Sequence, residues 1–120
     1  MFLNLSHTKL DAYYWTKKLC LECYKAVAEF PREENYILVQ QIKRAALSVH
    51  LNVAEGASRK SEVERKRFYE IARSSLVEID AAMDIAELQS YCNKNNLNNL
   101  GEVIVKTFKI ISGLINPVKR

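Results

Sequence analysis

The chain has 120 residues, of which 48% are hydrophobic, with only three glycines and two prolines. This length can bury a self-sufficient core, and we expect one domain spanning residues 1–120. Scarce glycine and proline favour long helices over many short strands joined by tight turns. No apolar run approaches the ~20 residues of a membrane-spanning helix. The first residues lack a signal-peptide pattern, so we expect a cytoplasmic protein with no membrane partner.

The formal net charge of +4 is unevenly spread along the chain. Residues 59–73 hold three acidic residues and six basic ones, while residues 74–92 hold four acidic residues and no basic one. We call the six basic residues the basic band: Arg59, Lys60, Arg65, Lys66, Arg67 and Arg73. Such a band is compatible with a polyanionic partner and also with solvated helix faces.

The first predicted helix covers residues 8–28. Its apolar residues recur at spacings of three and four and predict one buried stripe: Leu10, Tyr13, Tyr14, Leu21, Tyr24, Val27 and Ala28. Phe30-Pro31 then ends the helix, because proline disfavours a helical residue before it.

The second predicted helix covers residues 33–56 and is apolar on two faces. Its core stripe is Leu38, Ile42, Ala45, Ala46, Val49 and Val53, and its opposite face carries Leu47, Leu51 and Ala54. Helices with two apolar faces are usually buried on both, so we expect Leu47 and Leu51 to contact another subunit. We expect Gly56 to end the helix, because glycine adopts the left-handed conformation without strain.

The third predicted helix covers residues 62–91 and begins with a capping box, in which Ser61 accepts from the Glu64 amide and the Glu64 carboxylate reaches back. Its predicted core stripe is Phe68, Ile71, Ala72, Ser75, Ile79, Ala82 and Ala86. A second line one heptad apart is a further candidate for subunit contact: Tyr69, Leu76 and Met83.

The fourth predicted helix covers residues 97–115, with Asn96 as its cap. Its predicted inward residues are Leu100, Ile104, Phe108, Ile111 and Ile115. Four helices with short connections predict an all-α fold, an up-down-up-down antiparallel four-helix bundle.

Catalytic and metal-binding patterns are weak. A di-metal bundle site needs Glu-x-x-His pairs, and neither His7 nor His50 follows a carboxylate by three residues. Cys20 and Cys23 form a CxxC within a helical pattern and have no second pair, which favours buried thiols over a zinc or redox site. We therefore expect no catalytic residue, no metal, no cofactor and no enzymatic activity.

Two polar features are candidates for function. A polar edge runs along the second helix: Gln41, Arg44, Ser48, Asn52 and Glu55. We expect it to hydrogen-bond across the bundle with Ser75 and Glu78 of the third helix, or to bind a partner. The basic band is the candidate nucleic-acid site. No aromatic platform for base stacking is evident, so contacts would be made to the phosphate backbone and would be sensitive to salt.

Several motifs also resemble a known family. They are Phe30-Pro31, Gln41-Ile42-x-Arg44-Ala45-Ala46, Ser48-x-x-x-Asn52-x-Ala54-Glu55-Gly56, Arg59-x-Ser61 and Arg67-Phe68-x-x-Ile71-Ala72. The chain resembles the bacterial four-helix-bundle proteins named for intervening sequences in 23S rRNA genes, and the resemblance covers about residues 10–115. His50 stands where that family often has proline, which suggests a straighter second helix.

The resemblance implies an up-down bundle that assembles as a homopentamer, with an association with RNA. A related bundle is the accessory variability protein of diversity-generating retroelements, which binds a reverse transcriptase and nucleic acid. The leading hypothesis is a non-enzymatic homo-oligomer that binds nucleic acid, with RNA preferred, through the basic band. The alternative is a protein-interaction scaffold that docks a polypeptide such as a reverse transcriptase.

Overall fold

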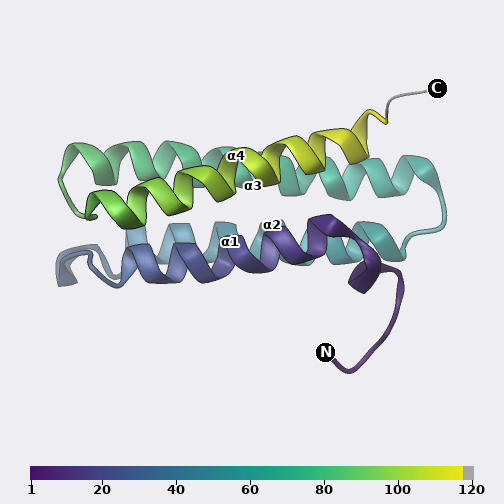
Figure 1. Cartoon of the computed structure of the whole chain (residues 1–120), viewed down its shortest axis with the longest axis horizontal. Helices are drawn as coiled ribbons and strands as arrows, with labels where there is room; N and C mark the ends of the chain where they lie inside the picture. The colour runs from purple at the N-terminus through teal and green to yellow at the C-terminus, as the bar shows by residue number, and fades with distance from the viewer. Residues whose placement is uncertain (118–120) are drawn as a thin grey trace.

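The computed structural model describes residues 1–117, which form four long antiparallel helices (Figure 1). They are α1 (Asp11–Val27), α2 (Leu38–Ser58), α3 (Glu62–Leu88) and α4 (Lys94–Ile115), with short 3-10 helices η1 (Ser6–Lys9) and η2 (Arg32–Glu34). Each helix packs against the next in the chain, and α4 returns to pack against α1. This confirms the predicted all-α, up-down-up-down four-helix bundle.

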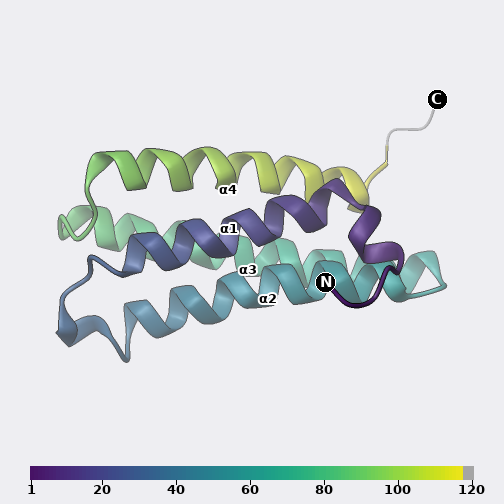
Figure 2. The same ribbon diagram turned by 60° about the horizontal axis from the view of Figure 1, so that its bottom comes forward.

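Figure 2 shows that the helix connections gather at the two ends of the bundle. The connections between α1 and α2 and between α3 and α4 lie at one end, and the α2–α3 loop lies at the other. The molecule measures 44 × 32 × 20 Å along its principal axes. No helix within residues 1–117 is long and apolar enough to cross a membrane.

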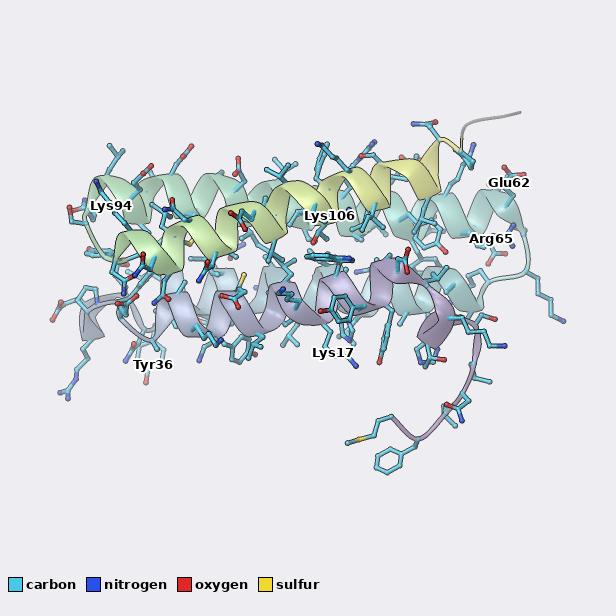
Figure 3. All side chains as sticks on the ribbon, viewed as in Figure 1. Lys17, Tyr36, Glu62, Arg65, Lys94 and Lys106 are labelled. Atoms are coloured by element: carbon cyan, nitrogen blue, oxygen red, sulfur yellow. The ribbon has the colours of Figure 1, made fainter. Side chains whose placement is uncertain are left out.

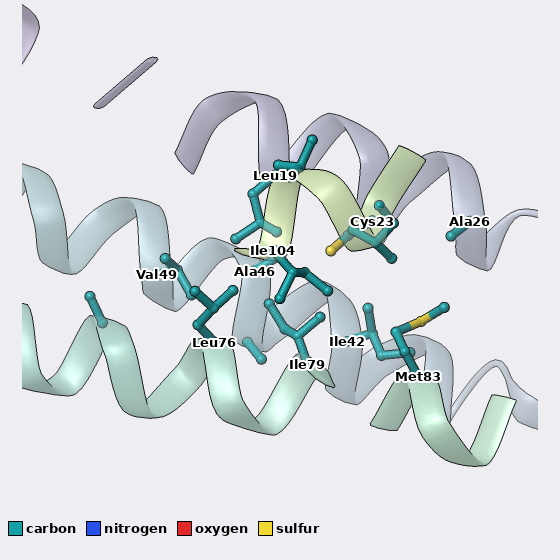
Figure 4. Packing of buried hydrophobic residues seen from close by; sticks show 14 of the residues in the cluster. Leu19, Cys23, Ala26, Ile42, Ala46, Val49, Leu76, Ile79, Met83 and Ile104 are labelled. Atoms are coloured by element: carbon teal, nitrogen blue, oxygen red, sulfur yellow. The ribbon is translucent and has the colours of Figure 1, made fainter. Parts of the chain in front are cut away.

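Aliphatic side chains from all four helices meet on the bundle axis. Figure 4 shows Leu19 of α1, Ile42 of α2, Ile79 of α3 and Ile104 of α4 converging there. Leu19, Ile42 and Ile79 are completely buried. The hydrophobic effect stabilises each such side chain by about 1.5–3 kcal/mol relative to an exposed position.

Three helix boundaries differ from the prediction because local turns replace helix. After Pro31 the chain forms η2 and a turn, so α2 begins five residues later than expected. Ser90 has a left-handed φ of 58° beyond the end of α3, which places Tyr91 against Phe30 with ring centroids 5.4 Å apart. Helix α4 starts early because the Asn93 side chain accepts from the Asn96 backbone amide at 2.8 Å.

Gly56 does not have the predicted helix-ending role. Helix α2 continues through it to Ser58, and no glycine in residues 1–117 has a positive φ. A Cβ atom at Gly56 would lie 2.7 Å from Cε1 of Tyr69 and 3.1 Å from Cβ of Phe68. The glycine therefore permits close packing between α2 and α3 near their connecting loop.

The buried stripe of α1 is rotated from the predicted one. The buried residues are Ala12, Thr16, Leu19, Glu22, Cys23, Ala26 and Val27. Tyr14, Leu21 and Tyr24, which were expected inside, are exposed. Both sets recur at helical spacing, and the smaller residues turn inward because they let α1 approach its neighbours closely.

The buried stripe of α3 corrects a second prediction. Tyr69, Leu76 and Met83 were expected to contact another subunit, but each is at most 5% exposed within one bundle. They pack on the bundle axis, as Figure 4 shows for Leu76 and Met83. Ile71, predicted to be inside, is instead exposed. On α4, Phe108 is likewise exposed, while Thr107 takes an inward position.

Candidate nucleic-acid interface

The α2–α3 loop, residues 59–61, positions the basic band at one end of the bundle. Ser61 caps α3, because its Oγ accepts from the Glu64 amide at 3.0 Å, as the capping box predicts. The Glu64 carboxylate lies 3.8 Å from Nη1 of Arg59. The cap and this contact fix the start of α3 relative to the loop.

Two arginines of the basic band hold the loop itself. Arg59 pairs with Glu55 one turn earlier and stacks over the Phe68 ring at 4.8 Å. Arg65 donates from Nη1 to the carbonyl oxygens of Arg59, at 3.2 Å, and Lys60, at 2.7 Å. These guanidinium groups hydrogen-bond to loop carbonyls and pair with a carboxylate, so their first role is structural.

Arg73 lies away from the loop, on the side of α3 that faces α4. Its Nη1 donates to Ser112 Oγ at 3.2 Å, and its guanidinium lies 5.8 Å from the centroid of the Phe108 ring. The contacts join α3 to α4. Arg73 therefore does not share a face with the loop residues.

The remaining members of the basic band are Lys60, Lys66 and Arg67. Lys60 and Arg67 are exposed, and Lys66 is half-buried. Lys66 and Arg67 line a shallow depression on α3 together with Glu70 and Glu78. The carboxylates partly neutralise the depression. Nearer the loop, Figure 3 labels Arg65 together with Glu62, so cations and carboxylates alternate there as well.

The polar edge contains one interhelical hydrogen bond within a small cluster. Ser48 Oγ lies 2.8 Å from Ser75 Oγ on α3, and Asn52 donates to the Ser48 carbonyl at 2.8 Å. Arg44 and Glu78 are exposed beside this cluster, and Glu55 pairs with Arg59. Ser48, Asn52 and Ser75 each have a hydrogen-bond partner within the bundle, which suits a structural role.

Lysine and aromatic side chains on α1 and α4 form a cluster that was not predicted from the sequence. The Lys18 ammonium lies 5.2 Å, and that of Lys106 5.8 Å, from the centroid of the Trp15 ring. Lys17 likewise lies 5.0 Å from the Tyr13 ring. The spacing of lysine three or four residues after an aromatic residue was the available signal for the pairs within α1.

The cysteines are poor nucleophiles. Burial raises the pKa of Cys20 to about 11 and that of Cys23 further, so little thiolate forms near neutral pH. The Cys20 thiol donates to the Ala46 carbonyl of α2 at 3.3 Å. These thiols behave as core side chains.

The fold defines the class of protein, since residues 1–117 form an up-down four-helix bundle with no strand. A family model described as 23S rRNA-intervening sequence protein matches residues 8–113, and the chain belongs to this family. This confirms the resemblance noted in the sequence.

A solved structure shares the bundle. It is a protein of unknown function from the S23 ribosomal protein family of Bacteroides thetaiotaomicron, with a TM-score of 0.77 and 14% sequence identity. The match covers 88% of this chain and 98% of that one, and at this identity it shows the fold alone. No curated protein matches the chain at a significant level.

Proposed function

We propose that the protein is a non-enzymatic homo-oligomer that binds nucleic acid, preferably RNA, through cations at the α2–α3 end of the bundle. The observation that carries this proposal is that the cations of the basic band have two different roles. Arg59 and Arg65 hold the loop, while Lys60 of the loop and Arg67 of α3 are exposed to solvent. The family name, which refers to an rRNA gene insertion, supports RNA over other polyanions.

The expected binding mode follows from the chemistry of these side chains. Lysine and arginine neutralise phosphates and release counterions, which gives affinity with little sequence specificity. A single copy offers few such contacts, so its affinity would be low. In an oligomer the same cations recur in every subunit and their attraction adds.

Filter binding to a structured RNA at two salt concentrations tests the proposal. We expect retention at low salt that falls steeply as salt rises, and a loss of at least tenfold in affinity for the triple variant Lys60→Ala, Lys66→Ala, Arg67→Ala. Arg65 is left intact because its removal would disturb the loop. No retention of the wild-type protein at low salt would contradict nucleic-acid binding.

The matched control replaces three exposed cations away from the loop: Arg32→Ala, Lys94→Ala and Lys106→Ala. It removes the same formal charge from other parts of the bundle. If the control lowers affinity as much as the loop variant, binding follows net charge and the proposed site is wrong.

The oligomer is supported by two leucines on the outer side of α2. Leu47 is 42% exposed and Leu51 is 60% exposed, although both are large aliphatic residues in a long amphipathic helix. Light scattering at micromolar concentration should give a mass several times the 13.8 kDa of one chain. Leu47→Asp should reduce this mass to that of a monomer and leave the helical circular dichroism unchanged. A monomeric wild-type protein would sink the oligomer proposal.

A further inference from the structure

The outer side of the α3–α4 pair carries a groove with an apolar floor. Val77, Val105 and Phe108 border a hollow of about 270 Å³, whose deeper walls are Leu76 and Ile104. A second hollow of about 210 Å³ continues it toward the loop between α3 and α4. The two hollows share Ile104 and Asp80, so they form one groove, which we call the α3–α4 groove.

One wall of this groove is acidic. Asp80, Asp84 and Glu87 follow one another at spacings of four and three along α3, and all three line the groove. Within residues 1–117 no lysine or arginine forms an ion pair with them. Lys109 lines the apolar end of the groove, so the negative charge is strongest toward Asp84 and Glu87. A ligand for this groove should therefore combine an apolar stripe with positive charge at that second end.

Gly101 lies on the opposite wall, in the interior of α4. Glycine there costs about 1 kcal/mol of helix stability relative to alanine. Among residues 1–117, nothing lies within 4 Å of where its Cβ would be, so its own bundle does not require a glycine. A close approach by something outside the bundle would explain the residue.

The outward side of α1 has the complementary properties. Tyr14, Leu21 and Tyr24 are exposed apolar residues on one side of the helix, with Leu21 55% exposed. Lys17, Lys18 and Lys25 lie among them. We call these six residues the α1 face.

Leu47 extends this surface onto α2. Lys43 of α2 lies 4.9 Å from the Tyr24 ring, and Leu47 follows Lys43 by one helical turn. Residues four apart lie on the same side of a helix, so Leu47 borders the α1 face. The leucine expected to mediate self-association is thus continuous with the α1 face.

We propose that the α1 face of one copy of this chain docks in the α3–α4 groove of the next copy, head to tail. This rests on the proposed homo-oligomer and names the two surfaces that build it. The α1 face runs for about 17 Å from Tyr14 to Lys25, and the groove for about 18 Å from Leu97 to Lys109, at 1.5 Å per residue. The lengths match, apolar side chains meet apolar side chains, and lysines meet the acidic wall.

The two surfaces lie on different sides of the bundle, so their contact is heterologous. Every copy then offers one α1 face and one groove, and the rotation between successive copies decides whether assembly closes into a ring or continues as a filament. The apolar areas that a lone bundle leaves in water become buried, which supplies the free energy of association.

Mixing two variants tests this arrangement. The groove variant is Val77→Lys, Val105→Lys, and the face variant is Leu21→Asp, Tyr24→Asp. All four side chains are exposed, so each variant should keep the wild-type circular dichroism and melting temperature. Light scattering should find each variant alone as a monomer. Their mixture should give a species of twice the 13.8 kDa chain mass, because only one intact face and one intact groove meet.

Controls and contrary outcomes separate this inference from the proposal it rests on. Val63→Lys and Tyr36→Asp change exposed residues outside both surfaces and should keep the wild-type mass. If the wild type is an oligomer and either variant alone keeps that mass, the head-to-tail surfaces are wrong and the oligomer stands. Monomeric variants whose mixture stays monomeric also overturn the pairing. A monomeric wild type would overturn both.

Zero-length cross-linking of wild-type protein gives a second measurement that needs no variant. In an equal mixture of ¹⁴N- and ¹⁵N-labelled chains, carbodiimide should join Lys17, Lys18 or Lys25 to Asp80, Asp84 or Glu87. Mass spectrometry should find these links between differently labelled chains. Links between chains that consistently avoid the acidic wall would count against the groove.

Discussion

At the scale of the residue, two buried threonines illustrate how a hydroxyl can stabilise or destabilise the same core. Thr16 and Thr107 are both completely buried. Thr16 Oγ1 lies 2.8 Å from Nδ1 of His50 and 3.2 Å from the Tyr13 carbonyl. Within residues 1–117 the Thr107 hydroxyl has no hydrogen-bond partner.

We expect opposite results from replacing each threonine by valine. Thr107→Val removes an unsatisfied hydroxyl and should stabilise the protein by about 1 kcal/mol. Thr16→Val leaves a ring nitrogen of His50 without a partner and should destabilise it by about 1–2 kcal/mol. Urea denaturation measures the change in the free energy of unfolding for both variants, and each variant is the control for the other. Destabilisation by Thr107→Val would show that its hydroxyl is satisfied in solution.

His50 makes stability depend on pH. Burial, then the positive charge of Lys17 and the neighbouring His7, lowers the pKa of His50 below its ordinary value of 6.5. The unfolded chain therefore binds a proton at higher pH than the folded one. Stability is complete above about pH 6.5, falls as pH decreases below it, and levels off below the folded-state pKa.

His50→Gln should flatten this profile. Glutamine does not titrate, so the free energy of unfolding of the variant should change less between pH 7.5 and pH 5 than that of the wild type. Urea denaturation across this range measures the difference. His7→Gln should flatten the profile less, because His7 is the last of the three causes that lower the pKa of His50. Equal slopes for wild type and His50→Gln would assign the pH dependence to other groups.

At the scale of the element, glycine is required where α2 meets α3 and is not required near the end of α4. Gly56→Ala places a Cβ within 2.7 Å of the Tyr69 ring and should destabilise the bundle by about 1–3 kcal/mol. Gly113→Ala meets nothing within 4 Å and should stabilise it by about 0.5–1 kcal/mol through helix propensity. Thermal melts of both variants should shift in opposite directions. A raised melting temperature for Gly56→Ala would mean that α2 and α3 move apart to accommodate the added Cβ at little cost in free energy.

The periodicity of the sequence predicted four helices, their order and most of the core stripe of α2, because the longer of its two apolar stripes is the buried one: Ile42, Ala45, Ala46, Val49 and Val53. It could not choose between two stripes on α1 or on α3. Tyr69 and Ile71 each belong to a stripe with helical spacing, and only packing against the neighbouring helices decides that Tyr69 is buried and Ile71 exposed. The short turn after Pro31 was missed because Glu33 and Glu34 resemble a normal helix start.

At the scale of the whole molecule, the basic band was predictable as a concentration of charge but its internal roles were not. That Arg65 binds the carbonyls of Arg59 and Lys60 depends on the path of the loop, which no spacing reveals. The acidic stretch of residues 74–92 was equally visible in the sequence. Its placement along an apolar groove follows from the way α3 and α4 pack.

Assembly should therefore strengthen nucleic-acid binding, whereas loss of the RNA-binding cations should leave assembly in the absence of RNA unchanged. Leu47→Asp leaves every cation of the α2–α3 loop in place but removes the neighbouring subunits. A monomer neutralises fewer phosphates on one RNA, so its affinity should fall at least tenfold, and the slope of log affinity against log salt should become shallower. The triple variant Lys60→Ala, Lys66→Ala, Arg67→Ala should lose RNA affinity while keeping the wild-type mass in light scattering.

Tyr36→Asp is the matched control for this coupling. It introduces the same charge as Leu47→Asp at a side chain that is 88% exposed, at the end of the bundle away from the basic loop (Figure 3). It should change neither the mass nor the salt slope, because it touches neither the subunit contacts nor the RNA. If monomeric Leu47→Asp binds RNA with the wild-type affinity and slope, each bundle binds independently and assembly serves another purpose. A shallower slope for Leu47→Asp alone would show that RNA contacts several subunits at once.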